Sequence, residues 1–245
     1  MHPIEEPELT PELIRSRADG LLDRLRAVAE GARRDPGGFR LVAVTKGFGL
    51  PVAHAAMQAG LHVLGENRVQ EAEPKVLALP EAEWHLVGHL QSNKARRALA
   101  LFGTIHSVDS LDLLVRLERL SHDDGKRPEI LLQVNVTGEE GKAGFDRTWF
   151  AAQLDRPGEL ARALGELRHA RPAGLMTLAR AGANERQQHE TFASLRDLRD
   201  RLQQVSGVSL PELSMGMTAD APAAVAEGAT LVRVGTALFG PRPGH

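Results

Sequence analysis

The sequence predicts an α/β protein of the (β/α)8 TIM-barrel class, folded as one domain over residues 1–245. Short β-branched runs bounded by Gly, Asn or Asp recur along the chain, and a stretch rich in Ala, Leu, Arg and Glu with helical spacing follows each. Eight such runs occur, which is the number of strands that closes a parallel barrel. No stretch rich in Pro, Gly or Ser is long enough to separate two domains.

The predicted strands are short, and their apolar residues are expected to fill the centre of the barrel. They cover residues 39–46, 62–67, 83–88, 104–109, 129–136, 171–178, 212–217 and 231–240. The first, FRLVAVTK, ends on a lysine, and the last, LVRVGTALFG, carries an arginine in its middle.

Between these strands apolar residues return every three or four positions, which is typical of helices with one buried face. The clearest predicted helices cover residues 51–60, 92–102, 110–122 and 184–205. The sequence stops within a few residues of the last predicted strand, so we expect no helix after it. The helix predicted over residues 11–32 precedes the first strand and is expected to complete the outer ring.

An open, doubly wound sheet is the rival architecture, because the same alternation of strands and helices permits it. Such sheets commonly carry a glycine-rich phosphate motif after a strand. Neither GxGxxG nor GxxxxGK[ST] follows any predicted strand here, and the count of eight favours closure.

Composition excludes several classes of function. A net charge of −2 and a pI near 6.6 give no reason to expect nucleic acid or anionic lipid as a partner. The absence of cysteine excludes disulfides and thiolate nucleophiles. The acidic N-terminus lacks the pattern of a signal peptide, and no apolar run approaches the roughly 20 residues that span a bilayer, so we expect a cytoplasmic protein.

The ends of the last two strands are typical of a phosphate site, which TIM barrels often place there. Ser214, Gly216 and Thr218 precede an expected helix start, where free backbone N–H groups favour an anion. Gly235 and Thr236 form a small pair that a phosphate can approach closely. The alternative is that these are only tight turns, with Thr218 as a helix cap.

Lys46 ends the first strand and is expected to face this phosphate site and Arg233. A partly desolvated lysine near another cation has a lowered pKa, and its neutral amine can form a Schiff base with a carbonyl. A phosphorylated aldehyde or ketone would satisfy both features. Equally open is a lysine that only pairs with a phosphate or with a carboxylate such as Glu66.

His85 and His89 lie four residues apart, a spacing that suggests a metal site when it falls on a helix. Here a strand gives way to a turn at Gly88, and no third ligand stands nearby. We therefore expect no metal ion and interpret both histidines as polar lining residues.

Seven blocks of sequence, in their order and spacing, resemble the YggS/PROSC family of pyridoxal 5'-phosphate (PLP) homeostasis proteins. They are LVAVTK, LGENRVQE, WHLVGHLQSNK, ILLQVNVTGEEGKAGF, GLMTL, LSMGMTAD and LVRVGTALFG, between Leu41 and Gly240. The resemblance implies a barrel like the N-terminal domain of alanine racemase, which is fold type III among PLP proteins. It also implies PLP held as a Schiff base, and a role in buffering, carrying or delivering PLP without established turnover.

The resemblance also implies the residues that hold the cofactor. They are Lys46 for the covalent link, Asn67 beside the ring, Arg233 facing the pyridine nitrogen, and Ser214, Met215, Gly235 and Thr236 around the phosphate. The GFG turn after Lys46 departs from the Thr-Lys-Pro turn of many members, which leaves the shape of that loop open. No family role is carried onto residues 147–165.

A weak PLP-dependent amino-acid racemase is the enzyme alternative. Arginine cannot donate a proton to the pyridine nitrogen, so the ring stays neutral and is a poor electron sink. Alanine racemases use a tyrosine as second base and a C-terminal β-domain, whereas this sequence contains no tyrosine and ends soon after the eighth strand. We therefore expect a monomeric PLP carrier that serves PLP-dependent apo-enzymes.

A third alternative is a PLP-free sugar-phosphate lyase or isomerase in which Lys46 attacks a ketose phosphate.

Overall fold

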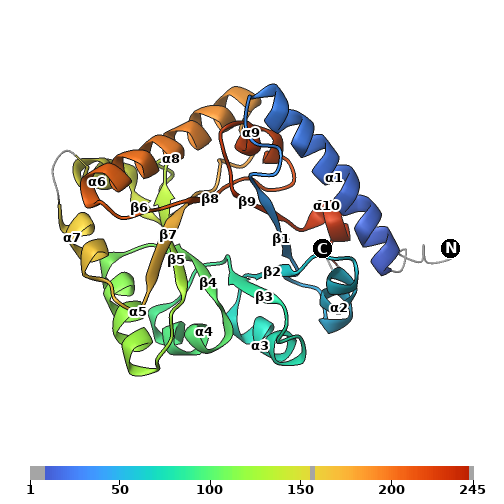
Figure 1. Ribbon diagram of the computed structural model, residues 1–245, viewed down its shortest axis with the longest axis horizontal. Helices are drawn as coiled ribbons and strands as arrows, with labels where there is room; N and C mark the ends of the chain where they lie inside the picture. The colour runs from blue at the N-terminus through green and yellow to red at the C-terminus, as the bar shows by residue number, and fades with distance from the viewer. Residues whose placement is uncertain (1–8, 155–157, 243–245) are drawn as a thin grey trace.

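A closed barrel of eight parallel strands forms the centre of the computed structural model, which describes residues 9–154 and 158–242 (Figure 1). The strands are β1 (Arg40–Val44), β2 (Val63–Glu66), β3 (Glu83–Leu86), β4 (Thr104–Val108), β5 (Glu129–Asn135), β7 (Arg171–Met176), β8 (Glu212–Ser214) and β9 (Leu231–Val234). Pairing of β4 with β5 and of β1 with β9 closes the sheet. Each of the eight lies inside a predicted strand, so the predicted barrel is confirmed.

Helices surround the barrel (Figure 1). They are α1 (Pro11–Gly31), α2 (Leu50–Gln58), α3 (Val69–Ala78), α4 (Ala95–Leu101), α5 (Leu111–Asp123), α6 (Arg147–Ala152), α7 (Glu159–Glu166), α8 (Glu185–Ser206), α9 (Ala221–Ala226) and α10 (Thr236–Phe239), with a 3-10 turn at Ser92–Lys94.

Helix α1 packs against α2, α9 and α10, so it completes the outer ring as predicted. The Thr10 side chain caps it by accepting from the backbone N–H of Leu13 at 3.3 Å, and Pro11 occupies its first turn. Its buried stripe includes Ile14 and Leu25, which are fully buried.

The prediction for residues 231–240 is wrong beyond Val234, because the chain turns at Gly235 and forms the short helix α10. The apolar residues Leu238 and Phe239 are buried, and the Phe239 ring packs against Phe48 with 5.6 Å between ring centroids. An apolar run of this length has no period that separates strand from helix. A helical turn therefore follows the last strand, where the sequence indicated none.

A short strand, β6 (Phe145–Asp146), was not predicted, and it pairs with the end of β5 beside the barrel. Gly144 precedes it with φ of 126°, and a Cβ there would lie 2.8 Å from the backbone nitrogen of Asn135. Glycine therefore lets the returning chain approach β5. Asp146 then caps helix α6 by accepting from the backbone N–H of Trp149 at 2.8 Å.

Buried side chains form two clusters, one on each face of the sheet, because successive residues of a strand point to opposite faces. Leu41 and Ala43 belong to the large cluster between the barrel and the helices. Val42 belongs to a small cluster of strand residues in the barrel interior, together with Leu131 and Leu231. The odd-numbered residues of β9 and the even-numbered residues of β1 therefore face the interior.

The ends of the predicted domain, residues 1–8 and 243–245, lie outside the described residues, and so do residues 155–157. Among the helices that the structure describes, none combines the length and the apolar character needed to cross a membrane.

Candidate functional site

Arg233 projects from β9 into the barrel interior, on the same face as Leu231. It is 4% exposed, its Nη2 donates to the carbonyl of Thr177 at 2.8 Å, and its Nη1 donates to the hydroxyl of Ser214. Burial lowers the pKa of Arg233 to about 10, which still leaves it charged at neutral pH. No carboxylate of residues 9–154 or 158–242 forms an ion pair with Arg233. A buried cation of this kind indicates a ligand that is anionic or rich in electrons.

Lys46 lies at the end of β1, two residues after the interior-facing Val44, and is half-buried. Burial lowers the pKa of Lys46, and the positive charges of Arg242 and Arg233 lower it further, while Glu66 acts in the opposite direction. A larger share of the amine is therefore neutral than in a free lysine. This is the environment that makes a lysine a nucleophile toward carbonyls.

Glu66, the carboxylate that sequence analysis offered as a partner for Lys46, binds a different lysine. Its Oε1 accepts from Lys75 Nζ at 2.6 Å and from the Thr45 hydroxyl at 2.6 Å. Lys75 lies on helix α3 and also donates to the carbonyl of Thr45 at 3.0 Å. Glu66 thus connects β2 to its covering helix, and its charge is already partnered.

The GFG loop after Lys46 takes a defined shape that the sequence had left open. Gly47 has φ of 79°, a left-handed conformation that favours glycine. The side chain of Arg242 lies over it, since a Cβ at Gly47 would be 2.8 Å from Arg242 Cδ. Phe48 is buried against Phe239. The loop therefore packs on α10 and brings Arg242 close to Lys46.

Asn67 follows β2 directly and is partly buried. The loop after β3 packs closely on it, because a Cβ at Gly88 would lie 2.3 Å from the backbone oxygen of Asn67. Only glycine fits this contact without a backbone shift. Close packing of the two loops therefore fixes the backbone of Asn67 at the end of β2.

The loops after β8 and β9, predicted to hold a phosphate, lie side by side: the Thr218 hydroxyl accepts from the backbone N–H of Ala237 at 3.3 Å. Gly235 and Thr236 begin helix α10, and a Cβ at Gly235 would lie 3.1 Å from the carbonyl oxygen of Val44 at the end of β1. The ends of β1 and β9 are therefore close together.

Ser214 and Met215 are fully buried. The Ser214 hydroxyl bonds to Arg233 and to His106, and the Met215 side chain belongs to the large apolar cluster. The backbone N–H of Met215 donates to the carbonyl of Leu231 at 3.2 Å. The side chains of Ser214 and Met215 are therefore not free to bind a phosphate, and these residues can only support the loop that would bind it.

The interior also holds a histidine to which sequence reasoning gave no role. His106 on β4 is fully buried, and its Nδ1 lies 2.7 Å from the Ser214 hydroxyl. His85 is buried beside it, with 2.8 Å between His85 Nδ1 and His106 Nε2. Strand alternation is the sequence signal that places both rings in the interior. His85 follows Trp84 and His106 follows Ile105, and both of these apolar residues face the helices.

His89 does not join His85: it lies at the surface, where its Nδ1 is 3.0 Å from an Asp109 carboxylate oxygen. Within residues 9–154 and 158–242 no group of three or more His, Asp or Glu side chains is arranged to hold a metal ion.

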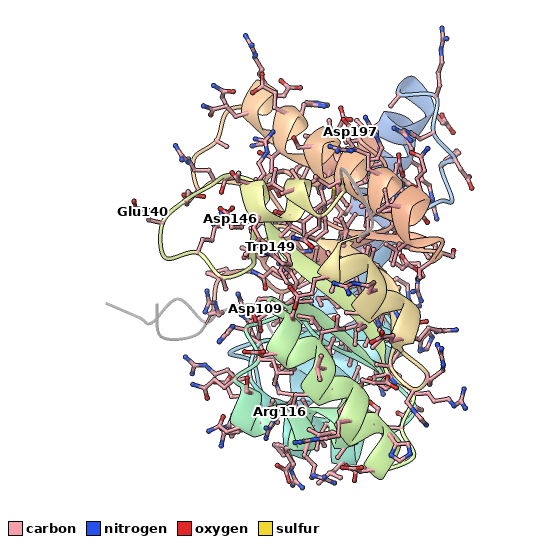
Figure 2. The ribbon with its side chains drawn as sticks, turned by 90° about the vertical axis from the view of Figure 1, so that its left-hand side faces the viewer. Asp109, Arg116, Glu140, Asp146, Trp149 and Asp197 are labelled. Atoms are coloured by element: carbon pink, nitrogen blue, oxygen red, sulfur yellow. The ribbon has the colours of Figure 1, made fainter. Side chains whose placement is uncertain are left out.

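A loop from residue 137 to residue 144 leaves the end of β5 and returns to β6. Figure 2 shows Glu140 at its far end and Asp146 and Trp149 where the chain re-joins the barrel. Lys142 Nζ fixes it by donating to the carbonyls of Leu178 and Ala179 at 3.1 and 3.2 Å. This loop is therefore tied to the chain that follows β7.

Comparison with known proteins identifies the family. The model of the family described as alanine racemase, N-terminal domain, matches residues 19–243. A pyridoxal phosphate homeostasis protein of Synechocystis sp. is 42% identical over 210 residues, which are 84% of this chain and 93% of that protein. The chain belongs to the pyridoxal phosphate homeostasis family. A member from Pseudomonas aeruginosa is 41% identical over 89% of this chain and 91% of its own length, and the predicted family is thereby confirmed.

Solved structures agree with this membership in the homeostasis family. The structure of PipY of Synechococcus elongatus with PLP bound has a TM-score of 0.79 at 39% identity, covering 93% of this chain and 100% of that chain. The alanine racemase of Corynebacterium glutamicum has a TM-score of 0.68 at 16% identity, covering 96% of this chain and 62% of that chain. The second likeness shows a shared fold only.

Proposed function

We propose that this chain binds PLP through a Schiff base on Lys46 and serves to buffer, carry or deliver the cofactor without turning over a substrate. The observation that carries the proposal is the proximity of two residues. Lys46 has a lowered pKa and lies near Arg233, a buried arginine that forms no ion pair with a described carboxylate. PLP supplies an aldehyde, a phosphate and an electron-withdrawing ring, and these residues match its parts.

Each predicted residue has a place in this proposal. Arg233 faces the pyridine nitrogen and Asn67 lies beside the ring. Gly235 and Thr236 hold the phosphate with their backbone N–H groups at the start of α10. Ser214 and Met215 support that loop from within, because both side chains are buried. PLP-bound PipY and the names of the relatives support the choice of ligand.

A carrier role agrees with the chemistry of Arg233. An arginine keeps its own proton and leaves the ring nitrogen unprotonated, which weakens the ring as an electron sink. The sequence also holds no tyrosine to act as a second base. The curated relatives are named for homeostasis, and the likeness to the solved racemase structure, at 16% identity, shows a shared fold only.

We also propose the setting in which the chain acts. It works in the cytoplasm as a single domain over residues 1–245, as a monomer that hands PLP to apo-enzymes and binds neither nucleic acid nor membranes. The net charge of −2 and the lack of a membrane-spanning helix in the described part of the chain support this setting.

The test is a visible spectrum of the purified protein with PLP, then borohydride reduction and peptide mapping. A phosphopyridoxyl group on the peptide that contains Lys46 is expected. Lys46→Ala should lose it, whereas Lys126→Ala, which alters an exposed lysine, should keep it. A label on any other lysine would contradict the assignment.

Two further measurements address the alternatives. Deuterium exchange at the α-carbon of amino acids in heavy water, beyond the rate with free PLP, would establish a racemase. A borohydride-trapped adduct with a triose phosphate, in protein that fails to bind PLP, would establish a sugar-phosphate enzyme instead. We expect neither result.

A further inference from the structure

A continuous chain of hydrogen bonds crosses the barrel interior, from the end of the barrel at which β3 begins to the guanidinium of Arg233. Its links are Glu83 Oε1 to His85 Nε2 at 2.9 Å, His85 Nδ1 to His106 Nε2 at 2.8 Å, His106 Nδ1 to Ser214 Oγ at 2.7 Å, and Ser214 Oγ to Arg233 Nη1. The two histidines and the serine are fully buried, whereas the Glu83 side chain is 43% exposed. The proposed cofactor function uses none of the first three residues.

When both rings are neutral, the carboxylate end of the chain fixes the direction of every bond, because an ionised carboxylate can only accept. Glu83 accepts from His85 Nε2, which leaves His85 Nδ1 to accept from His106 Nε2. His106 Nδ1 then accepts from the Ser214 hydroxyl, whose oxygen also accepts from Arg233. In this arrangement each link holds one hydrogen, and each histidine is the Nε2–H tautomer.

The electrostatics agree with this arrangement. Burial lowers the pKa of His106 well below its usual range, and the charges of Arg233 and Arg40 act in the same direction, so His106 is neutral. The hydrogen bond from His85 lowers the pKa of Glu83, which is therefore ionised at neutral pH.

Further charges lie at the outer end of the chain. Arg40 on β1 pairs with Glu83 at 3.2 Å and lies 3.8 Å from a carboxylate oxygen of Glu212 on β8. Arg40, together with Arg233 on β9, acts on His106 from the surrounding strands.

One added proton reverses part of the chain. A cationic His85 carries hydrogens on both ring nitrogens, so it donates to Glu83 and also to His106 Nε2. His106 must then move its hydrogen to Nδ1 and donate to Ser214. The serine oxygen would accept from His106 and from Arg233 together, and its own hydrogen would have to turn away. The bond that holds Arg233 is thereby weakened by a proton taken up near the exposed Glu83.

We propose that His85 and His106 are positioning residues that act through Ser214 on Arg233, and that this hydrogen-bond chain couples protonation at the end of the barrel where the strands begin to the cofactor ring. This inference rests on the proposed binding of PLP beside Arg233. If the inference holds, the visible absorption band of bound PLP depends on groups that lie inside the barrel at the end opposite to its mouth. The hydrogen bonds from Glu83 to Arg233 change only their donor and acceptor directions and the orientation of the Ser214 hydroxyl, and no net reaction takes place.

The first test uses the protein without PLP and therefore does not depend on the proposed function. Nitrogen-15 NMR of the imidazole rings at neutral pH should show His85 and His106 as neutral rings with hydrogen on Nε2. His106→Asn should remove one of the two buried ring signals and assign the other. A hydrogen on His106 Nδ1 at neutral pH would overturn the inferred direction of the chain.

The second test follows the visible band of PLP-loaded protein from about pH 5 to about pH 8, the range in which histidine takes up a proton. Glu83→Gln removes a negative charge next to the histidine pair, so the midpoint of the low-pH spectral change should move to lower pH. His106→Asn interrupts the chain and should abolish that change.

Glu129→Gln is the matched control, because Glu129 also begins a barrel strand and pairs with an exposed arginine, Arg171, but contacts no histidine in the described structure. It should titrate like the unaltered protein. If PLP binds to Lys46 and all three variants titrate alike, the coupling is refuted while the proposed function stands. If no PLP band or Lys46 adduct forms, the proposed function fails, and the coupling to the ring fails with it.

Discussion

Lys75 and Glu66 form a buried ion pair with 2.6 Å between Nζ and Oε1, on the side of β2 that helix α3 covers. The pair decides the chemistry of a third residue. Because Glu66 is bound to Lys75 and to Thr45, it forms no ion pair with Lys46, and burial together with the positive charges of Arg242 and Arg233 outweighs its opposing effect on the pKa of Lys46. Glu66 thus forms its ion pair with Lys75 and not with Lys46.

Removal of Lys75 should therefore alter both stability and reactivity. Lys75→Met leaves the Glu66 carboxylate buried without its cation, which costs about 3–5 kcal/mol in the free energy of unfolding. The freed negative charge also raises the pKa of Lys46, so reaction with PLP should need a higher pH. Urea denaturation measures the first effect and the pH dependence of the PLP band the second. Lys126→Met, at an exposed lysine, should change neither.

Arg242 should tune the reactivity of Lys46 from the loop that follows α10. Its charge lowers the pKa of Lys46, so Arg242→Gln should shift the pH midpoint of Schiff-base formation upward by a fraction of a unit. The difference should shrink at high salt, because Arg242 is exposed and its field is screened. Arg186→Gln, at an exposed residue of α8, serves as the control. Equal midpoints for all three proteins would show that Arg242 does not act on Lys46.

Lys46 should also destabilise the protein when PLP is absent. Its pKa is lower in the folded than in the unfolded chain, so the folded state disfavours the bound proton. The resulting cost is present below the folded pKa and disappears as the pH rises past the unfolded value of about 10.4. Lys46→Met should thus gain less than about 1 kcal/mol at neutral pH, since solvent screens a half-buried charge, and nothing above about pH 10.4. A gain that persists at high pH would point to packing instead.

Gly88 should be essential for the placement of Asn67. A Cβ at Gly88 would lie 2.3 Å from the Asn67 backbone oxygen, so Gly88→Ala forces the backbone to move and should cost about 1–3 kcal/mol. The loss of PLP affinity should exceed what the loss of stability alone would cause, because the substitution displaces Asn67, which we propose lies beside the ring. Gly103→Ala is the control, since a Cβ at Gly103 meets nothing within 4 Å. Thermal unfolding and PLP titration of both variants separate the two effects.

Much of the barrel could be predicted because the local sequence patterns of its strands and helices favour the same elements that the fold contains. Apolar, β-branched residues such as Leu41 to Val44 mark strands that are buried on both faces. Asn184 marks the start of the longest helix, where its side chain accepts from Gln187 in a capping box. The end of the last strand was missed because Leu238 and Phe239 are buried in a helical turn as readily as in a strand.

The site could be predicted only in part. Lys46 could be found because a polar residue that ends a buried strand must emerge at the barrel mouth. The contact between His106 and Ser214 joins residues 108 positions apart, and neither lies in a motif that indicates it. The position of Arg242 over Gly47 likewise depends on how the end of the chain folds back, which no local pattern encodes.

Pairing of β1 with β9 joins residues 40–43 to residues 231–234, so the first and last strands of the barrel are neighbours. During synthesis on the ribosome the N-terminal part of the chain emerges first and begins to fold. A nascent chain that still lacks β9 has Lys46 but not Arg233, and its barrel is open on that side. The PLP site that we propose is therefore complete only in a polypeptide that includes β9, and translation products that lack this strand should bind PLP more weakly than the folded barrel.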